Sequence, residues 1–492
     1  MTPSTTITPP APVFPERAHL RTRMTRPQRH RLLHGYPLAA AMPTRRPGRP
    51  HCDVQPDPAR GLLVGVLPHP FCNPTVAGCG FCTFAHEPYH GGRAAAVIDH
   101  VAREVLIRLG RLWGLGRRVD ALYFGGGTAN LSPAEPFRRL CRTLVESLDF
   151  RDAEVTLEGV PAYFVKRRPL LMDVIREEIP ARHFRVSMGI QTFDAARLRQ
   201  MGRQAFGEVP TFVEVVEAAH ERGFTVSADL LFDLPHQTLA EMRRDVDRAD
   251  ALGLDHLGLY HLVLFRGLGT EWSRDPDLIA GLPDSEDAAG HWLDLRDQLV
   301  CTGWTQTTLT NFERAAFRRD PRRFVYEEFS FRPDRYDALG FGPGGISFAA
   351  DRDFGGGLKV LNPDGADAYA AAVDLGGPPW ERFFRYAPTD LRVFYLTRRL
   401  AALEIDRGEY RQLFDTDVLA DFGKEFTAAA EEGLVEVTAA AVRPTPRGMF
   451  YADAVASLVA RRQTEALKIP VPAPAATARR AKRADHNGYG HM

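Results

Sequence analysis

The chain of 492 residues is predicted to be an α/β protein, an open, partial barrel of six βα units followed by a C-terminal, mainly helical, winged-helix-like domain. Between about residues 56 and 275, short apolar runs rich in β-branched residues alternate with longer amphipathic runs, which is typical of βα units around a parallel sheet. Six units are fewer than the eight of a closed barrel, so the barrel is expected to stay open. After about residue 381, helical patterns outnumber strand patterns.

The strands and helices of the six units are expected to follow one another directly. The candidate strands are 62–67, 121–124, 154–157, 184–190, 225–232 and 257–262. The candidate helices are 94–115, 133–148, 169–178, 211–222 and 239–252. In folds of this type, ligands bind at the carboxyl ends of the parallel strands. Side chains that end these strands are therefore the first candidates for a site.

Two further regions follow the barrel. Residues 276–380 have a mixed pattern that we interpret as an α/β extension closing the barrel, with a Gly-rich turn at 341–347. Residues 381–465 combine three helical patterns with a short strand near 434–437, which favours a small winged-helix-like unit. Such a unit could bind DNA, but it lacks a basic recognition face, so we favour a packing or lid role.

Both termini have the composition of flexible segments. Residues 1–55 are rich in proline and arginine and are expected to form a flexible extension, although the stretch 31–38 is apolar enough to dock on the body. Residues 466–492 are expected to be a disordered tail. This tail is basic, so a nucleic-acid contact is an alternative that we rank below simple solvated disorder.

Composition excludes several classes of protein. The 62 Lys and Arg residues balance the 62 Asp and Glu residues, so the net charge is zero and the whole chain is not expected to bind a polyanion. The hydrophobic fraction of 44% and the charged fraction of 25% are those of an ordinary globular protein. No apolar run approaches the roughly 18 residues of a membrane span, and the N-terminus does not resemble a secretory signal. We expect a cytoplasmic protein with neither nucleic-acid nor membrane partners.

Three of the six cysteines lie close together, at Cys72, Cys79 and Cys82, directly after the first predicted strand. Three thiolates on one loop can bind three irons of a cubane cluster and leave the fourth iron open to another ligand. The alternative is a zinc site with three cysteines and one histidine. The histidines near enough in sequence for that alternative are His69, His86 and His90, and the remaining cysteines, Cys52, Cys141 and Cys301, are expected to be inert.

From about residue 62 to residue 458 the sequence resembles the radical S-adenosylmethionine (SAM) superfamily, and within it the oxygen-independent coproporphyrinogen III oxidase-like family. Many short blocks match in the same order, which makes the resemblance specific. They are Phe81 between the last two cysteines, 123–128 (YFGGGT), Glu158, 185–193 (RVSMGIQTF), 201–203 (MGR), 229–238 (DLLFDLPHQT), the Gly-rich turn ending at Ile346 and Ser347, Asn362 with Tyr369, and 445–448 (TPRG).

The resemblance implies a [4Fe-4S] cluster held by the three clustered cysteines, and two molecules of SAM. Glycines at a strand end let the backbone approach the methionine part of SAM, a carboxylate can bind its ribose or ammonium, and an arginine can grip its carboxylate. By resemblance, the second SAM would lie near Phe81, Gln191, Arg203 and Asp229. The full set of expected cofactor-binding residues is Phe81, Gly126, Gly127, Thr128, Glu158, Gln191, Arg203, Asp229, Tyr260 and Ile346.

Three departures from the family pattern bear on the substrate. Six residues separate the first two cysteines, where the family has three. Val66 stands where porphyrinogen-oxidising members carry a tyrosine, and Asp233 replaces the usual glycine before the Leu-Pro pair. These departures leave SAM cleavage untouched and put the porphyrinogen substrate in doubt.

We therefore expect a radical SAM enzyme that methylates an unsaturated carbon of a specialised metabolite, or forms a cyclopropane there, with a second SAM as donor. It would act on a small-molecule substrate and take single electrons from a donor such as flavodoxin or ferredoxin. The alternatives are oxidative decarboxylation of coproporphyrinogen III, a haem-modifying methyltransferase, and a non-catalytic haem chaperone. The sequence leaves the catalytic residues unidentified.

Overall fold

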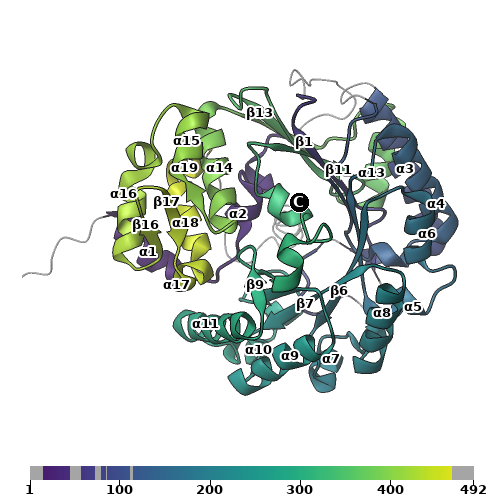
Figure 1. The fold of residues 1–492 in the computed structure, drawn as a ribbon, viewed down its shortest axis with the longest axis horizontal. Helices are drawn as coiled ribbons and strands as arrows, with labels where there is room; N and C mark the ends of the chain where they lie inside the picture. The colour runs from purple at the N-terminus through teal and green to yellow at the C-terminus, as the bar shows by residue number, and fades with distance from the viewer. Residues whose placement is uncertain (1–14, 45–56, 73–78, 85, 111–114, 468–492) are drawn as a thin grey trace, which may run out of the picture.

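The structure, a computed structural model, describes residues 15–44, 57–72, 79–84, 86–110 and 115–467. Its centre is a sheet of twelve strands in the order β14-β13-β12-β11-β1-β4-β5-β6-β7-β8-β10-β9. Figure 1 shows helices around the outside of this curved sheet and a second group of helices, α14 to α18, beside it. The predicted α/β class, with a mainly helical C-terminal region, is confirmed.

Six strands of the sheet run parallel and pair in chain order, as the sequence predicts. Two of them have the predicted bounds, and the ends of the other four differ from the prediction by at most two residues. They are β1 (Gly61–Val66), β4 (Ala121–Phe124), β5 (Glu154–Gly159), β6 (His183–Gln191), β7 (Thr225–Phe232) and β8 (His256–His261).

The helices that follow these strands cover the outer face of the sheet. The main ones are α3 (Gly91–Arg108), α4 (Ala134–Ser147), α6 (Leu171–Glu178), α8 (Val209–Glu221) and α9 (Leu239–Ala251). The predicted helix 94–115 corresponds to α3, which ends at Arg108; a π-helical turn follows at 109–110, and residues 111–114 lie outside the described residues. The shorter or later helices are α5 (Pro161–Val165), α7 (Ala195–Gln200), α10 (Pro276–Ala280), α11 (Ser285–Cys301) and α13 (Ala366–Asp374).

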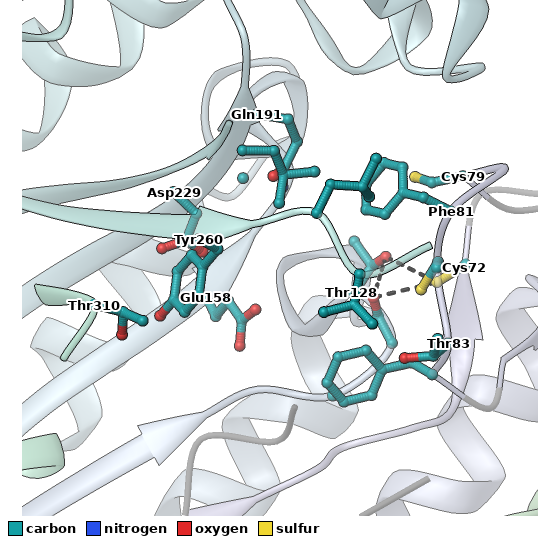
Figure 2. A pocket seen from close by; sticks show the side chains of 18 of the residues that line it. Cys72, Cys79, Phe81, Thr83, Thr128, Glu158, Gln191, Asp229, Tyr260 and Thr310 are labelled. Atoms are coloured by element: carbon teal, nitrogen blue, oxygen red, sulfur yellow. Dashed lines mark hydrogen bonds between the residues drawn. The ribbon is translucent and has the colours of Figure 1, made fainter. Parts of the chain in front are cut away.

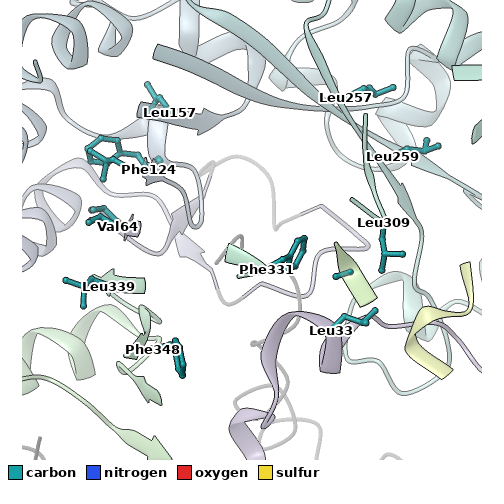
Figure 3. Packing of buried hydrophobic residues seen from close by; sticks show 14 of the residues in the cluster. Leu33, Val64, Phe124, Leu157, Leu257, Leu259, Leu309, Phe331, Leu339 and Phe348 are labelled. Atoms are coloured by element: carbon teal, nitrogen blue, oxygen red, sulfur yellow. The ribbon is translucent and has the colours of Figure 1, made fainter. Parts of the chain in front are cut away.

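Side chains alternate between the two faces of each strand, which gives the sheet two packed faces. Val64 and Phe124 belong to the large core beneath the outer helices, and Figure 3 shows them with Leu157 and Leu339. Tyr123, on the opposite face, packs against Tyr326 with ring centroids 5.0 Å apart. The short helix α12 (Tyr326–Ser330) thus covers the second face of the first strands.

Residues 304–386 extend the sheet at both edges. On the β1 side, β11 (Tyr336–Phe341) is parallel to β1, and three antiparallel strands follow it. They are β12 (Ile346–Ala350), β13 (Gly357–Leu361) and β14 (Arg382–Tyr386). On the β8 side, β10 (Asn311–Arg314) and β9 (Trp304–Gln306) are antiparallel. The extension predicted from the mixed pattern is therefore part of the same sheet.

The C-terminal region packs helices around a three-stranded antiparallel sheet, β15-β17-β16. The arrangement resembles a small winged unit. The strands are β15 (Ile405–Asp406), β16 (Val435–Val437) and β17 (Ala441–Pro444), and the helices are α14 (Pro388–Ala401), α15 (Arg407–Phe414), α16 (Val418–Glu431), α17 (Pro446–Phe450), α18 (Ala452–Val459) and α19 (Arg461–Ala466).

The N-terminal segment differs from the flexible extension that composition suggests. Residues 15–44 form α1 (Pro15–Met24) and α2 (Arg31–Gly35), which lie against the C-terminal helices (Figure 1). The Arg17 guanidinium pairs with Glu432 at 2.7 Å, and the Tyr36 hydroxyl donates to Asp390 at 2.7 Å. The tail from residue 468 onward lies outside the described residues. Among those described, no helix is both long and apolar enough to cross a membrane.

Candidate active site at the carboxyl ends of the strands

A cavity of about 250 Å³ opens at the carboxyl ends of the parallel strands, where the fold predicts a ligand site. All three clustered cysteines line it, and Figure 2 shows Cys72 and Cys79. Of the ten expected cofactor-binding residues, nine also line it, contributed by the cysteine turn, the turn after β4, the strands β5 to β8 and the segment after α7. Ile346 is the exception, because it begins β12 and lines a separate small cavity beside Lys359.

The three cysteines reach the cavity from two short pieces of chain. Cys72 ends β2 (Phe71–Cys72), which pairs with β3 (Glu87–Pro88). Cys79 and Cys82 lie on one turn, closed by a hydrogen bond from the Cys82 amide to the Cys79 carbonyl at 2.8 Å. Residues 73–78 lie outside the described residues. Burial raises the pKa of all three thiols, that of Cys72 to about 12.

Polar groups around two of the sulfurs favour a metal-bound thiolate. The Arg203 guanidinium donates to Cys79 Sγ at 3.0 Å, and Thr128 Oγ1 lies 3.4 Å from Cys72 Sγ. A cation bound at the sulfurs would overcome the cost of burying their negative charge. The residues present therefore fit an iron-sulfur cluster bound through three cysteines.

The histidines of the zinc alternative have backbone partners. His69 Nδ1 accepts from the Phe71 amide, the His86 ring lies 2.9 Å from the Phe84 carbonyl, and His90 caps α3. Within the described ranges, no three His, Cys, Asp or Glu side chains are gathered as a site for a single metal ion.

Two glycines let the cysteine loop pack tightly. A Cβ on Gly127 would lie 3.0 Å from the Phe71 carbonyl oxygen, so this glycine lets the turn after β4 approach the strand that carries Cys72. A Cβ on Gly80 would lie 2.2 Å from Trp272 Nε1, and the Trp272 amide donates to the Gly80 carbonyl at 2.9 Å. The expected close approach of Gly127 is thus made, at least in part, to the protein's own backbone.

Two buried carboxyl groups lie on the side of the cavity away from the cysteines. Burial and the nearby charge of Asp229 raise the pKa of Glu158 to about 8, and burial raises that of Asp229 to about 7. Figure 2 shows both near Tyr260. A cationic ligand, such as an ammonium or a sulfonium, would favour the ionised form of both groups.

Gln191, at the end of β6, and Arg203, after α7, also line the cavity. The pairing of β6 with β7 shifts register between Gly189 and Gln191, and Gln191 has a φ of 71°, so the irregularity re-aims its side chain. Arg203 is only 6% exposed and also donates to the Gly189 carbonyl at 2.5 Å. Arg203 thereby links the Cys79 turn to the end of β6.

Sequence reasoning missed several residues that line the cavity. Four come from the N-terminal segment and two from the end of β8 and from α12, and none carries a motif. For the four N-terminal residues, the only sequence signal was the apolar stretch 31–38, which was expected to dock on the body and contains two of them. These residues are Arg29, His30, Arg31, His34, His261 and Glu327.

Comparisons with known proteins agree with this geometry. A family model described as the radical SAM superfamily matches residues 66–249. A haem chaperone HemW of Lactococcus lactis is 26% identical over 327 residues, covering 66% of this chain and 74% of the relative. An oxygen-independent coproporphyrinogen III oxidase of Synechocystis is 24% identical over 406 residues, covering 79% of this chain and 83% of the relative. The structure of coproporphyrinogen III oxidase (HemN) from Escherichia coli shares the fold, with a TM-score of 0.67 at 22% identity, over 82% of this chain and 91% of that one.

Proposed function

Since the chain belongs to the radical SAM superfamily, in its coproporphyrinogen III oxidase-like family, we propose that Cys72, Cys79 and Cys82 hold a [4Fe-4S] cluster and that the adjoining cavity binds SAM. The observation that carries the proposal is that three thiols, a glycine turn and two buried acids line one cavity at the strand ends. When bound, the cluster supplies one electron that breaks SAM into methionine and a 5′-deoxyadenosyl radical.

The protein's own residues would hold SAM by its polar ends. Arg203 is placed to bind a carboxylate near the Cys79 turn, and Glu158 and Asp229 are placed to accept from ribose hydroxyls or an ammonium. Thr128 and the glycine turn would approach the methionine part. The apolar rings of Phe81 and Trp272, 5.8 Å apart, would keep water from this side of the cavity.

For the overall reaction, we favour methylation or cyclopropane formation at an unsaturated carbon, with a second SAM as methyl donor. Support comes from Val66, which stands where the oxidases carry a tyrosine. Val66 is fully buried in β1 and does not line the cavity, so no phenol enters from this position. The electron donor would be a small protein such as flavodoxin or ferredoxin. The enzyme itself would be located in the cytoplasm.

The second candidate is the oxidation of coproporphyrinogen III, favoured by similarity to such an oxidase over 79% of this chain. A haem-modifying methyltransferase would be a variant of the same chemistry. A non-catalytic haem chaperone, supported by similarity to HemW, is a third candidate. A chaperone would bind haem stoichiometrically and turn over no SAM.

One isotope experiment separates methyl transfer from the oxidation of coproporphyrinogen III. The reduced, anaerobically reconstituted protein is incubated with methyl-deuterated SAM and a small-molecule extract of the source cells, and separately with coproporphyrinogen III. Methyl transfer puts deuterium into 5′-deoxyadenosine and releases S-adenosylhomocysteine alongside methionine. Unlabelled 5′-deoxyadenosine with carbon dioxide from coproporphyrinogen III would overturn methyl transfer in favour of the oxidase.

A further inference from the structure

Asp233, which replaces the glycine of the family pattern, joins two histidines at the edge of the cavity. It follows β7 with a φ of 60° and its side chain is 1% exposed. His291 Nδ1, from α11, lies 2.6 Å from Asp233 Oδ1, and His261 Nε2, at the end of β8, lies 3.3 Å from Asp233 Oδ2. One buried carboxylate therefore lies within ion-pair distance of two imidazoles, and the contact with His291 is the one with hydrogen-bond geometry.

The carboxylate of Asp233 is ionised in this arrangement. Burial alone would raise its pKa, but the contacts with His261 and His291 outweigh burial and keep the pKa of Asp233 below its usual value. The same contact raises the pKa of His291. An ionised carboxylate only accepts hydrogen bonds, so it favours the N–H form of an imidazole nitrogen that faces it at this distance.

The carboxylate therefore favours one tautomer of His261. In this tautomer Nε2, 3.3 Å from Asp233 Oδ2, carries the hydrogen, and Nδ1 keeps a lone pair. His261 Nδ1 is buried and has no hydrogen-bond partner among the described residues, and the ring lies between Phe232 and Phe450, each with centroids 5.1 Å away. His261 also lines the cavity. A buried acceptor without a partner in a cavity wall indicates a missing donor.

A second imidazole at the same end of the cavity repeats this feature. His30, from the N-terminal segment, lines the cavity, and its Nε2 is also buried without a partner in the described part of the chain. Burial lowers the pKa of His30, which keeps this ring neutral, with opposing effects from Asp453 and His261. Among the described residues, Asp233 contacts His261, His30 interacts with it electrostatically, and His291 contacts the other oxygen of Asp233.

We propose that His261 is a general base of the cavity, held in the required tautomer by Asp233, for a substrate that carries an enolic or phenolic hydroxyl. In the step, the substrate O–H bond breaks, its electron pair stays on oxygen, and the proton forms a bond to His261 Nδ1. Asp233 balances the imidazolium, and His30 Nε2 offers a second contact to the substrate. This inference rests on the proposed function, because a hydroxyl conjugated with the unsaturated carbon would activate that carbon.

The test uses the full chain reconstituted with cluster and SAM and labelled with ¹⁵N-histidine. The His261 resonances are assigned with His261→Gln, and phenol is compared with anisole, which has the same ring but no O–H. We expect His261 to be in the Nε2–H tautomer. We also expect the Nδ1 resonance to shift on titration with phenol, with a dissociation constant about tenfold lower than that of anisole, equivalent to about 1.4 kcal/mol. An Nδ1–H tautomer, or equal binding of both probes, overturns the proposal.

Variants separate the chemical role from a structural one. Asp233→Asn should mix the His261 tautomers and abolish the phenol preference, and Asp233→Gly, which restores the family residue, should do the same if the first variant does not fold. His220→Gln is the matched control, because it removes an exposed histidine paired with Asp255 at 2.9 Å, away from the cavity, and should leave the phenol preference unchanged. If both Asp233 variants keep the tautomer and the preference, the proposal is wrong. Failure of the proposed function would instead appear as a wild-type protein that cleaves no SAM.

Discussion

Replacing Arg203 by glutamine should weaken both the hold on the cluster and the binding of SAM. The guanidinium is almost fully buried and donates to Cys79 Sγ at 3.0 Å and to the Gly189 carbonyl at 2.5 Å. The glutamine side chain is neutral and shorter than that of arginine, so the variant loses at least the charged hydrogen bond to the Cys79 sulfur. Hydrogen bonds to charged groups contribute roughly 1.5–3 kcal/mol, which corresponds to a loss of about ten- to a hundredfold.

The assay measures two quantities on anaerobically reconstituted protein, the rate at which a chelator removes iron and the dissociation constant of SAM by equilibrium dialysis. Arg197→Gln is the matched control. Arg197 lies on the nearby α7, donates to the Pro235 carbonyl at 2.9 Å and pairs with Glu241 at 3.0 Å, but it does not line the cavity. Iron loss and SAM affinity in Arg203→Gln that equal those of Arg197→Gln would refute this reading of Arg203.

Three further outcomes are expected. Alanine at any one of the three cavity cysteines should abolish 5′-deoxyadenosine formation, whereas Cys301→Ala, at an exposed position, should not; full activity in a cavity variant would contradict the ligand assignment. Gly80→Ala should displace the Trp272 ring and lower the iron content after reconstitution, and iron content equal to wild type would show that the turn tolerates a Cβ. Burial lowers the pKa of Lys359 from 10.5 to about 7, so the unfolded chain binds more protons between these pH values and the free energy of unfolding should rise with pH there. Urea titrations at pH 7 and pH 9 give the free energy of unfolding, and Lys359→Met should lose the rise between these two pH values. An equal rise in wild type and variant would contradict the prediction.

Local sequence signals were enough to predict the parallel strands, because each strand is a buried apolar run flanked by turns. They were also enough for the cysteines and the glycine turn, whose residue types have few other uses in such a pattern. The N-terminal helices could not be predicted this way, since the partner of Tyr36 is Asp390, far along the chain. Composition alone suggested a flexible segment.

The missed cavity residues have the same physical cause. His261 and His30 are isolated histidines in sequence, and only the tertiary fold brings them to one end of the cavity. Asp233 was visible as a departure from the family pattern, but its meaning depends on His291, which lies on α11. Ile346 illustrates the opposite case, because a family position at a Gly-rich turn was expected at the cofactor and lies at a different cavity.

The most direct test of radical SAM chemistry at this cavity is the product of SAM cleavage. The anaerobically reconstituted protein is mixed with SAM and dithionite, and 5′-deoxyadenosine and methionine are quantified by mass spectrometry. The account predicts equal amounts of the two products, and none when Cys72, Cys79 or Cys82 is replaced by alanine. Tightly bound zinc without iron after anaerobic purification, together with no 5′-deoxyadenosine, would contradict it.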